Sequence, residues 1–458
     1  MTISNFSSKI LSFLLVPLYT SALSTEEYGI YDLYTTTAFL LIPLFSVCIS
    51  DATLRYTLDR HNEPGAVLSI SMKFYIRACL CITVLIVLNT IFSVVPLFNQ
   101  YPLFFLLYYY LCLLSDILTQ FARGLEKISD VAISGILSSI TTVTLNILLL
   151  LVFSLGLEGY FIANCSAFAT TIIYLVIRLK IWKYIKMSTS QQLKTEMERY
   201  SAPLIFNQIG WWINNVSDRY VVTWLCGTAA NGVYSVAYKI PSMLSIFQTI
   251  FNQAWTLSTV RESKNESSEF YSNIYKYYNC GLVILCSVFI AFDRLIARIL
   301  FASEFYQAWR YAPFLLISVV FVCLSGFFEG ILVAAKKTDI LAKTTIAGAG
   351  VNTVLNIIFV YIMGPIGAAI ATLISYFIVW AVRMKSVKSI MNIKFDLIRN
   401  IVSYCILTMQ ALCLFMRNNL FVLSIEMIAI IALIVIYANN LLFIIEKIRG
   451  KIKILFKL

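Results

Sequence analysis

A polar run interrupts an otherwise apolar segment near the middle of the chain, within residues 201–225. It carries four amides, one acid and one arginine, which are Asn207, Gln208, Asn214, Asn215, Asp218 and Arg219. A charge at the centre of a membrane-spanning helix costs about 2.5–3.5 kcal/mol on insertion scales. Such a cost is usually accepted only where a helix bundle or a water-filled cavity solvates the group. The run therefore predicts a helix that lines a polar cavity.

A second cation, Lys239, lies six residues after the predicted start of the next helix, and Arg219 lies six residues before the end of its own. On antiparallel neighbours, a rise of 1.5 Å per residue places both cations about 9 Å below one membrane face. Two cations at one depth predict a site for a diphosphate or another anionic group, and the planar fork of Arg219 suits phosphate. The alternative is a structural Asp218–Arg219 pair with a lysine that reaches to the interface.

Helical spacing distributes the rest of the run over a broad polar arc. Asp218 shares a face with Asn207 and Asn214, whereas Arg219 shares one with Gln208 and Asn215. Amides and the neighbouring indoles suit sugar hydroxyls and sugar ring faces, so these four amides are predicted to bind substrate together with Arg219 and Lys239. Polar contacts that hold helices together are the alternative.

Acids within the apolar segments are candidates for coupling transport to an ion gradient. Asp116 lies on one helical stripe with Tyr109, Gln120 and Arg123. It is predicted to take up a proton or a sodium ion. The alternative is that it pairs with Arg123 through Gln120. Asp218 is the second coupling candidate. Four further acids lie near predicted helix ends, where solvation at the membrane boundary is expected, namely Asp32, Asp51, Glu329 and Glu426.

Composition identifies the class of protein that contains these residues. Of 458 residues, 60% are hydrophobic and 13% are charged, and the mean hydropathy is +0.83. Soluble domains carry about 25% charge, so the sequence predicts an all-α integral membrane protein. One histidine excludes sites that need two, and neither a phosphate-binding P-loop nor a nucleophile motif occurs. We therefore expect no enzyme, no metal and no cofactor, and the eleven cysteines are expected to be small buried apolar residues.

A spanning helix needs about 20 mainly apolar residues. Fourteen are predicted, over residues 3–23, 29–51, 74–97, 102–122, 131–154, 159–179, 201–225, 233–255, 273–299, 311–334, 340–363, 366–384, 396–416 and 421–445. With a cytoplasmic N-terminus, 29 of the 35 lysines and arginines fall on the cytoplasmic side and four on the opposite side. This bias follows the positive-inside rule, by which lysines and arginines orient the helices in the membrane. The excess positive charge is explained in this way, and no nucleic-acid partner is predicted.

Two pairs of segments indicate an internal repeat. Residues 124–147 align without gaps to 334–357, and Tyr28-Gly29-Ile30-Tyr31 is similar to Asn231-Gly232-Val233-Tyr234. The offset of 203–210 residues spans about six helices, and an even number preserves direction, so two parallel six-helix repeats are predicted. Chance similarity between apolar sequences is the alternative. The predicted domains are an N-terminal lobe (1–180), a basic cytoplasmic linker (181–200), a C-terminal lobe (201–390), and two additional helices with a basic cytoplasmic tail (391–458).

Several of these motifs resemble the polysaccharide (O-antigen) flippases of the Wzx type. The resemblance rests on SKILSFLLVPLYT at 8–20, EYGIYDL at 27–33, SDRY at 217–220 and GVYSVAYK at 232–239. That family belongs to the multidrug/oligosaccharidyl-lipid/polysaccharide exporter superfamily. The resemblance implies a V-shaped pair of lobes in the bacterial inner membrane that moves undecaprenyl-diphosphate-linked oligosaccharide, such as O-antigen or capsule units, to the periplasmic leaflet by alternating access. Lipid-linked oligosaccharide, membrane lipid, and the polymerase and glycosyltransferases of the same pathway are the implied partners.

Two other functions remain open at this stage. A cation-coupled multidrug exporter of the same superfamily would need an apolar pocket with acids, which the two cations Arg219 and Lys239 disfavour. A membrane glycosyltransferase or polymerase would need a sizeable extramembrane loop, and the loops between the predicted helices are short.

Overall fold

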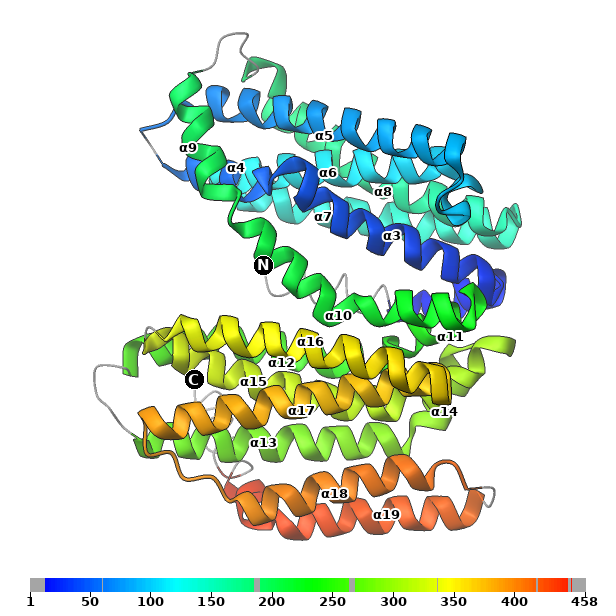
Figure 1. Ribbon diagram of the computed structural model, residues 1–458, viewed down its shortest axis with the longest axis vertical. Helices are drawn as coiled ribbons and strands as arrows, with labels where there is room; N and C mark the ends of the chain where they lie inside the picture. Colours follow the sequence, from blue (N-terminus) through cyan, green and yellow to red (C-terminus); the bar gives the residue numbers. More distant parts are fainter. Residues whose placement is uncertain are drawn as a thin grey trace, which may run out of the picture. The chain divides into compact units, whose positions relative to one another are not determined.

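The computed structural model describes residues 13–59, 61–184, 190–262, 268–335, 337–416, 419–443 and 446, and every regular element in these ranges is helical (Figure 1). The chain forms two compact units. The first extends to Thr223 and includes Gly227–Gly232 and Ala302–Glu304. The second contains Trp224–Cys226, Val233–Phe301 and the residues from Phe305 onward.

The helices follow one another in sequence with short connections. Those up to the polar run are α2 (Val16–Ala22), α3 (Thr25–Ser46), α4 (Ile49–Leu58), α5 (Pro64–Phe92), η1 (Pro96–Asn99), α6 (Pro102–Gly124), α7 (Ile128–Asn146), η2 (Ile147–Val152), α8 (Gly156–Leu179), η3 (Ile181–Lys183), α9 (Gln191–Ser201) and α10 (Leu204–Cys226). Those that follow are α11 (Thr228–Ala237), α12 (Lys239–Glu262), α13 (Ser268–Ala291), α14 (Asp293–Leu300), η4 (Ser303–Arg310), α15 (Ala312–Ala334), α16 (Thr338–Met363), α17 (Pro365–Ile390), α18 (Leu397–Cys413) and α19 (Asn419–Ile436).

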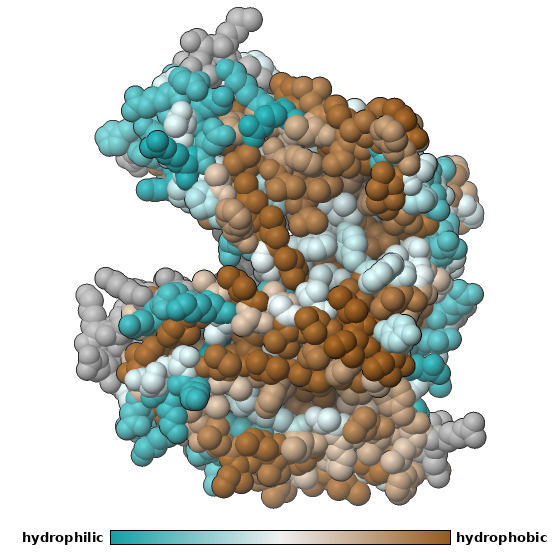
Figure 2. Space-filling view, viewed as in Figure 1, coloured by the Kyte–Doolittle hydropathy of each residue, from teal (hydrophilic) through white to brown (hydrophobic). Residues whose placement is uncertain are grey.

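Within the described ranges, eight helices are long and apolar enough to cross a membrane, and α3 with α4 makes a ninth if the bent pair is one span. The apolar flanks of the helices form broad bands on the surface in Figure 2. In the window that qualifies α7 with η2 as a span, only 11% of the residues are buried, as expected of a lipid-facing helix. The prediction of an all-α integral membrane protein is thus confirmed, but the count of fourteen spans is not. The polar run makes α10 less apolar than these eight helices, and the apolar segments of α18 and α19, Leu397–Cys413 and Leu420–Ile436, are shorter than 18 residues.

A break divides the second predicted span into α3 and α4, whose axes meet at 58°. Val47 and Cys48 at the break have positive φ angles of 57° and 49°, and Pro43 lies in the last turn of α3. Proline removes a helical hydrogen bond and its ring bends the helix. The break places Ser50 and Asp51 in the first turn of α4.

A reciprocal contact joins the two glycine motifs of the predicted repeat. A Cβ atom on Gly29 in α3 would meet the Thr228 carbonyl oxygen, and a Cβ on Gly232 in α11 would meet the Thr25 carbonyl oxygen. Each added Cβ would also lie 3.1 Å from the backbone nitrogen of the opposite glycine. Contact of residue i with j′ and of i′ with j is the signature of a two-fold relationship. The two copies of the motif therefore pack backbone to backbone about a local pseudo-two-fold axis.

Candidate functional site

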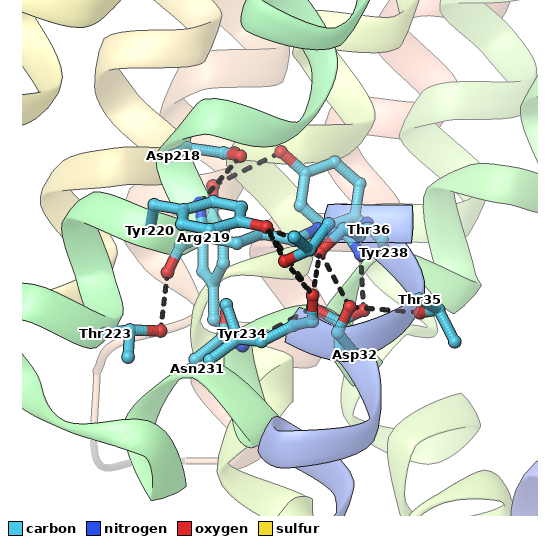
Figure 3. A network of polar contacts seen from close by, with 12 residues as sticks. Asp32, Thr35, Thr36, Asp218, Arg219, Tyr220, Thr223, Asn231, Tyr234 and Tyr238 are labelled. Atoms are coloured by element: carbon cyan, nitrogen blue, oxygen red, sulfur yellow. Dashed lines mark hydrogen bonds and ion pairs between the residues drawn. The ribbon is translucent and has the colours of Figure 1, made fainter. Parts of the chain in front are cut away.

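Arg219 of α10 forms an ion pair with Asp32 of α3 (Figure 3). The two side chains are 17% and 9% exposed. Asn231 at the start of α11 donates from Nδ2 to the other Asp32 carboxylate oxygen at 3.4 Å. The expectation that Asp32 is solvated at a membrane boundary is therefore wrong, because its carboxylate is buried and compensates the Arg219 charge.

A layer of hydroxyl and indole contacts fixes α10 against α3 beside this ion pair. The Tyr220 hydroxyl lies 2.5 Å from the Thr37 Oγ1, and the Trp212 indole N–H donates to the Thr36 carbonyl at 2.8 Å. The Trp212 and Tyr220 rings also contact each other, with centroids 5.0 Å apart. These contacts hold the backbone of α10 in register with α3, so that the guanidinium of Arg219 meets Asp32.

Asp218 precedes Arg219 in α10 and contacts the Arg219 backbone. Its side chain is buried, with 3% of the residue exposed. One carboxylate oxygen accepts a hydrogen bond from the Arg219 backbone N–H at 3.0 Å. The acid that pairs with the Arg219 guanidinium is thus Asp32, from another helix. Coupling by Asp218 stays a prediction.

The amides of α10 extend from the ion pair toward the N-terminal end of the helix. Asn207 and Gln208 are exposed, and the Trp211 ring between the amides is 58% exposed. Asn214 and Asn215 each donate to the carbonyl four residues earlier, at 3.0 and 2.8 Å. A helix of a membrane protein that presents exposed amides is expected to face a polar cavity rather than lipid.

Lys239 is the first residue of α12, in the second unit, and is partly exposed. Substrate binding by Lys239, by Arg219 and by the four amides stays a prediction.

Asp116 in α6 lies at the break between α3 and α4. Ser50 and Gln120 form hydrogen bonds with its carboxylate, and the charges of Asp51 and Arg123 act on it. Arg123 Nη1 also donates to the Gln120 Oε1 at 3.4 Å, so the stripe from Asp116 to Arg123 is formed. Interrupted helices commonly form ion sites in transporters, because the break exposes backbone polar groups. Coupling of transport to an ion by Asp116 stays a prediction.

Replacing Tyr220 with phenylalanine removes one hydroxyl from the layer between α10 and α3. We expect a loss of about 1 kcal/mol in the free energy of unfolding, because the Thr37 hydroxyl loses a hydrogen-bond partner in a partly buried position. Thermal denaturation of the purified protein measures this loss. Tyr361→Phe is the matched control, since Tyr361 is 80% exposed and should be insensitive. Equal stability of the two variants would show that the Tyr220 contact contributes nothing.

Comparison with solved structures identifies the class of protein. The chain matches the lipid II flippase MurJ in an inward closed conformation with a TM-score of 0.72 and 17% identity, over 96% of this chain and 99% of that one. It also matches an inward-facing multidrug resistance MATE family transporter of the MOP superfamily, with a TM-score of 0.65 and 15% identity, over 85% of this chain and 98% of that one. The chain therefore shares the helical fold of these two proteins.

The family follows from the sequence itself. The family described as "Polysaccharide biosynthesis protein" matches residues 1–256, more than half of the chain, and the MatE family matches residues 203–358. The chain belongs to the polysaccharide biosynthesis protein family of the multidrug/oligosaccharidyl-lipid/polysaccharide exporter superfamily.

Two curated relatives are archaeal membrane proteins. The probable low-salt glycan biosynthesis flippase Agl15 of Haloferax volcanii is 23% identical over 256 residues, which is 52% of this chain and 53% of the relative. The uncharacterized membrane protein MJ1068 of Methanocaldococcus jannaschii is 25% identical over 214 residues, which is 45% of this chain and 42% of the relative. The chain thus spans about half the length of each.

Proposed function

We propose that the protein is a secondary transporter that flips a polyprenyl-diphosphate-linked oligosaccharide across the membrane by alternating access. Undecaprenyl-diphosphate-linked O-antigen or capsule units are the proposed cargo, and the proposed direction is from the cytoplasmic to the periplasmic leaflet of the bacterial inner membrane. Both termini are proposed to be cytoplasmic. The observation that carries the proposal is α10, whose exposed amides lead to an arginine that is ion-paired in a partly buried position.

Each part of this helix suits one part of the proposed cargo. Sugar hydroxyls both donate and accept hydrogen bonds, and Asn207 and Gln208 offer exposed amides that do the same. The exposed indole of Trp211 supplies a flat apolar surface for a sugar ring. Arg219 supplies the fork of donors that a diphosphate accepts. Lys239 of α12, in the second unit, is proposed as a further cation for an anionic group.

Because Arg219 is already paired with Asp32, an anion that binds Arg219 must replace the Asp32 carboxylate. A buried arginine without a counter-ion is costly, so Asp32 keeps the empty site stable. An incoming diphosphate competes with Asp32 for the same guanidinium. Binding energy is then coupled to the contact between α3 and α10, which gives the substrate a direct means of changing the conformation. Asp116 and Asp218 are the proposed coupling acids, with a proton or sodium ion as the coupling ion.

The match of residues 203–358 to the MatE family favours a second candidate, a cation-coupled multidrug exporter. Transport of small cationic dyes by the purified protein would support this candidate. Translocation of a lipid-linked oligosaccharide without dye transport would support the first. Neither candidate includes catalysis, and glycosyltransferases and a polymerase of the same pathway are proposed partners of a flippase.

The test in cells replaces the gene by variants and measures surface polysaccharide. Arg219→Ala is expected to reduce surface polymer at least about tenfold and to leave lipid-linked units on the cytoplasmic side, because loss of a hydrogen-bonded charge costs several kcal/mol of binding. Arg298→Ala is the control, since Arg298 is exposed in α14. Unchanged polymer from Arg219→Ala at equal protein level would contradict the assignment.

A further inference from the structure

Two acids of the second unit, Asp293 and Glu426, form a buried polar cluster with Gln410. The proposed substrate site does not use this cluster. Asp293 is the first residue of α14, Glu426 lies in α19 and Gln410 lies in α18. They are 0%, 1% and 0% exposed. The helices α18 and α19 pack against each other, and α14, α18 and α19 each pack against α13. Boundary solvation, which the sequence indicated for Glu426, is therefore wrong.

One hydrogen bond orders part of this cluster. Gln410 donates from Nε2 to the Glu426 Oε2 at 2.6 Å. The Glu426 charge repels the Asp293 carboxylate electrostatically, and the Arg294 charge attracts both carboxylates. The Arg294 guanidinium also donates to the Leu414 and Met416 carbonyl oxygens, so its charge is shared with the end of α18.

The cluster contains more buried acceptors than donors. Both carboxylate oxygens of Asp293, the Glu426 Oε1 and the Gln410 Oε1 are buried, and none has a hydrogen-bond partner among the described residues. Carboxylates accept but do not donate hydrogen bonds, and an unpaired acceptor in a low-dielectric interior is costly. Four buried oxygens from three side chains on three helices are therefore available to a cation or to a hydrogen-bond donor.

Charge balance and oxygen chemistry favour a metal cation over a proton. Two carboxylates and Arg294 sum to one negative charge, which a single monovalent cation neutralises. One proton on Glu426 would supply a single donor and leave at least two of the four oxygens without a partner. Hard cations instead take several oxygen ligands at once.

We propose that Asp293, Glu426 and Gln410 form a binding site for one alkali metal cation, Na⁺ or K⁺, that joins α14 to α18 and α19. The site contains neither Asp116 nor Asp218, the acids proposed for coupling. Its existence does not depend on what the protein transports. Cation binding there holds the last two helices against α13 and α14.

The test uses the full-length protein purified in detergent without alkali metal, with choline chloride as the salt. Addition of 100 mM NaCl or KCl at constant ionic strength is expected to raise the Tm of the wild-type protein by about 3 °C or more, because a ligand that binds only the native state stabilises it. Glu426→Gln and Asp293→Asn keep the side-chain shapes and are expected to lose this rise. Asp339→Asn, an exposed acid in α16, is the matched control and should keep it.

Direct binding of ²²Na⁺ to the wild-type protein keeps the proposal testable if either variant fails to fold. About one ion per chain is expected, displaced by excess NaCl and not by choline chloride. Three results would overturn the proposal: equal Tm in choline and in both alkali salts, a cation response retained by Glu426→Gln, or a Tm that follows pH alone. The last result would assign the cluster to a proton.

Discussion

Alanine at Gly29 is expected to destabilise the protein by about 3 kcal/mol, although only one methyl group is added. The new Cβ would overlap the Thr228 carbonyl oxygen, which is main chain at the start of α11. A backbone atom cannot rotate away as a side chain does, so α3 and α11 must separate along their whole contact. Overpacking usually costs about 1–3 kcal/mol, and a clash with backbone is at the upper end.

The same change at Gly350 is the matched control for Gly29→Ala. A Cβ on Gly350 in α16 would have no neighbour within 4 Å, and alanine favours a helix over glycine by about 1 kcal/mol. Chemical denaturation or the Tm of the purified variants measures both. Gly232→Ala should lose as much as Gly29→Ala, because the contact is reciprocal. Equal stability of the Gly29→Ala and Gly350→Ala variants would show that the two motifs are not in close contact.

The second large effect is expected at the buried ion pair. Asp32→Asn leaves the Arg219 guanidinium without its counter-ion, and such a loss costs about 3–5 kcal/mol. Arg219→Gln leaves Asp32 uncompensated and should cost a similar amount. The double variant removes both charges and is expected to be more stable than either single variant. A double-mutant cycle on unfolding free energies therefore gives a coupling of several kcal/mol.

An exposed ion pair provides the control for this cycle. Lys343 and Asp339 in α16 are 3.9 Å apart with side chains 81% and 63% exposed. Surface pairs of this kind contribute about 0–1 kcal/mol, so the same cycle there should give a coupling below 1 kcal/mol. Additive losses at Asp32 and Arg219 would show that the two side chains do not stabilise each other.

The sequence predicted the polar helix but not the partner of its arginine. Arg219 was evident because a charge within an apolar segment is costly wherever its counter-ion lies. Asp32 lies 187 residues earlier in the chain, and helical periodicity relates only residues of one helix. The available signal was Asp32 itself, an acid followed by Thr35, Thr36 and Thr37 within an apolar segment. Because Asp32 was assigned to the solvated membrane boundary, it was not predicted as the counter-ion of Arg219.

Packing explains two further differences between the prediction and the structure. The glycine motifs were found as a repeat, but their mutual contact depends on two helices approaching without side chains, which only coordinates show. The break between α3 and α4 follows Pro43, which indicated a kink without giving its angle.

The central claim, that Arg219 and Asp32 belong to a site for a lipid-linked diphosphate oligosaccharide, is tested most directly by translocation in proteoliposomes. Purified protein is reconstituted with a polyprenyl-diphosphate oligosaccharide, and the sugar that reaches the opposite leaflet is measured by its protection from an added glycosidase. Wild-type protein is expected to equilibrate the two leaflets, whereas Arg219→Gln with Asp32→Asn is expected to translocate at less than about a tenth of that rate while remaining folded. Translocation by this double variant at the wild-type rate would contradict the claim.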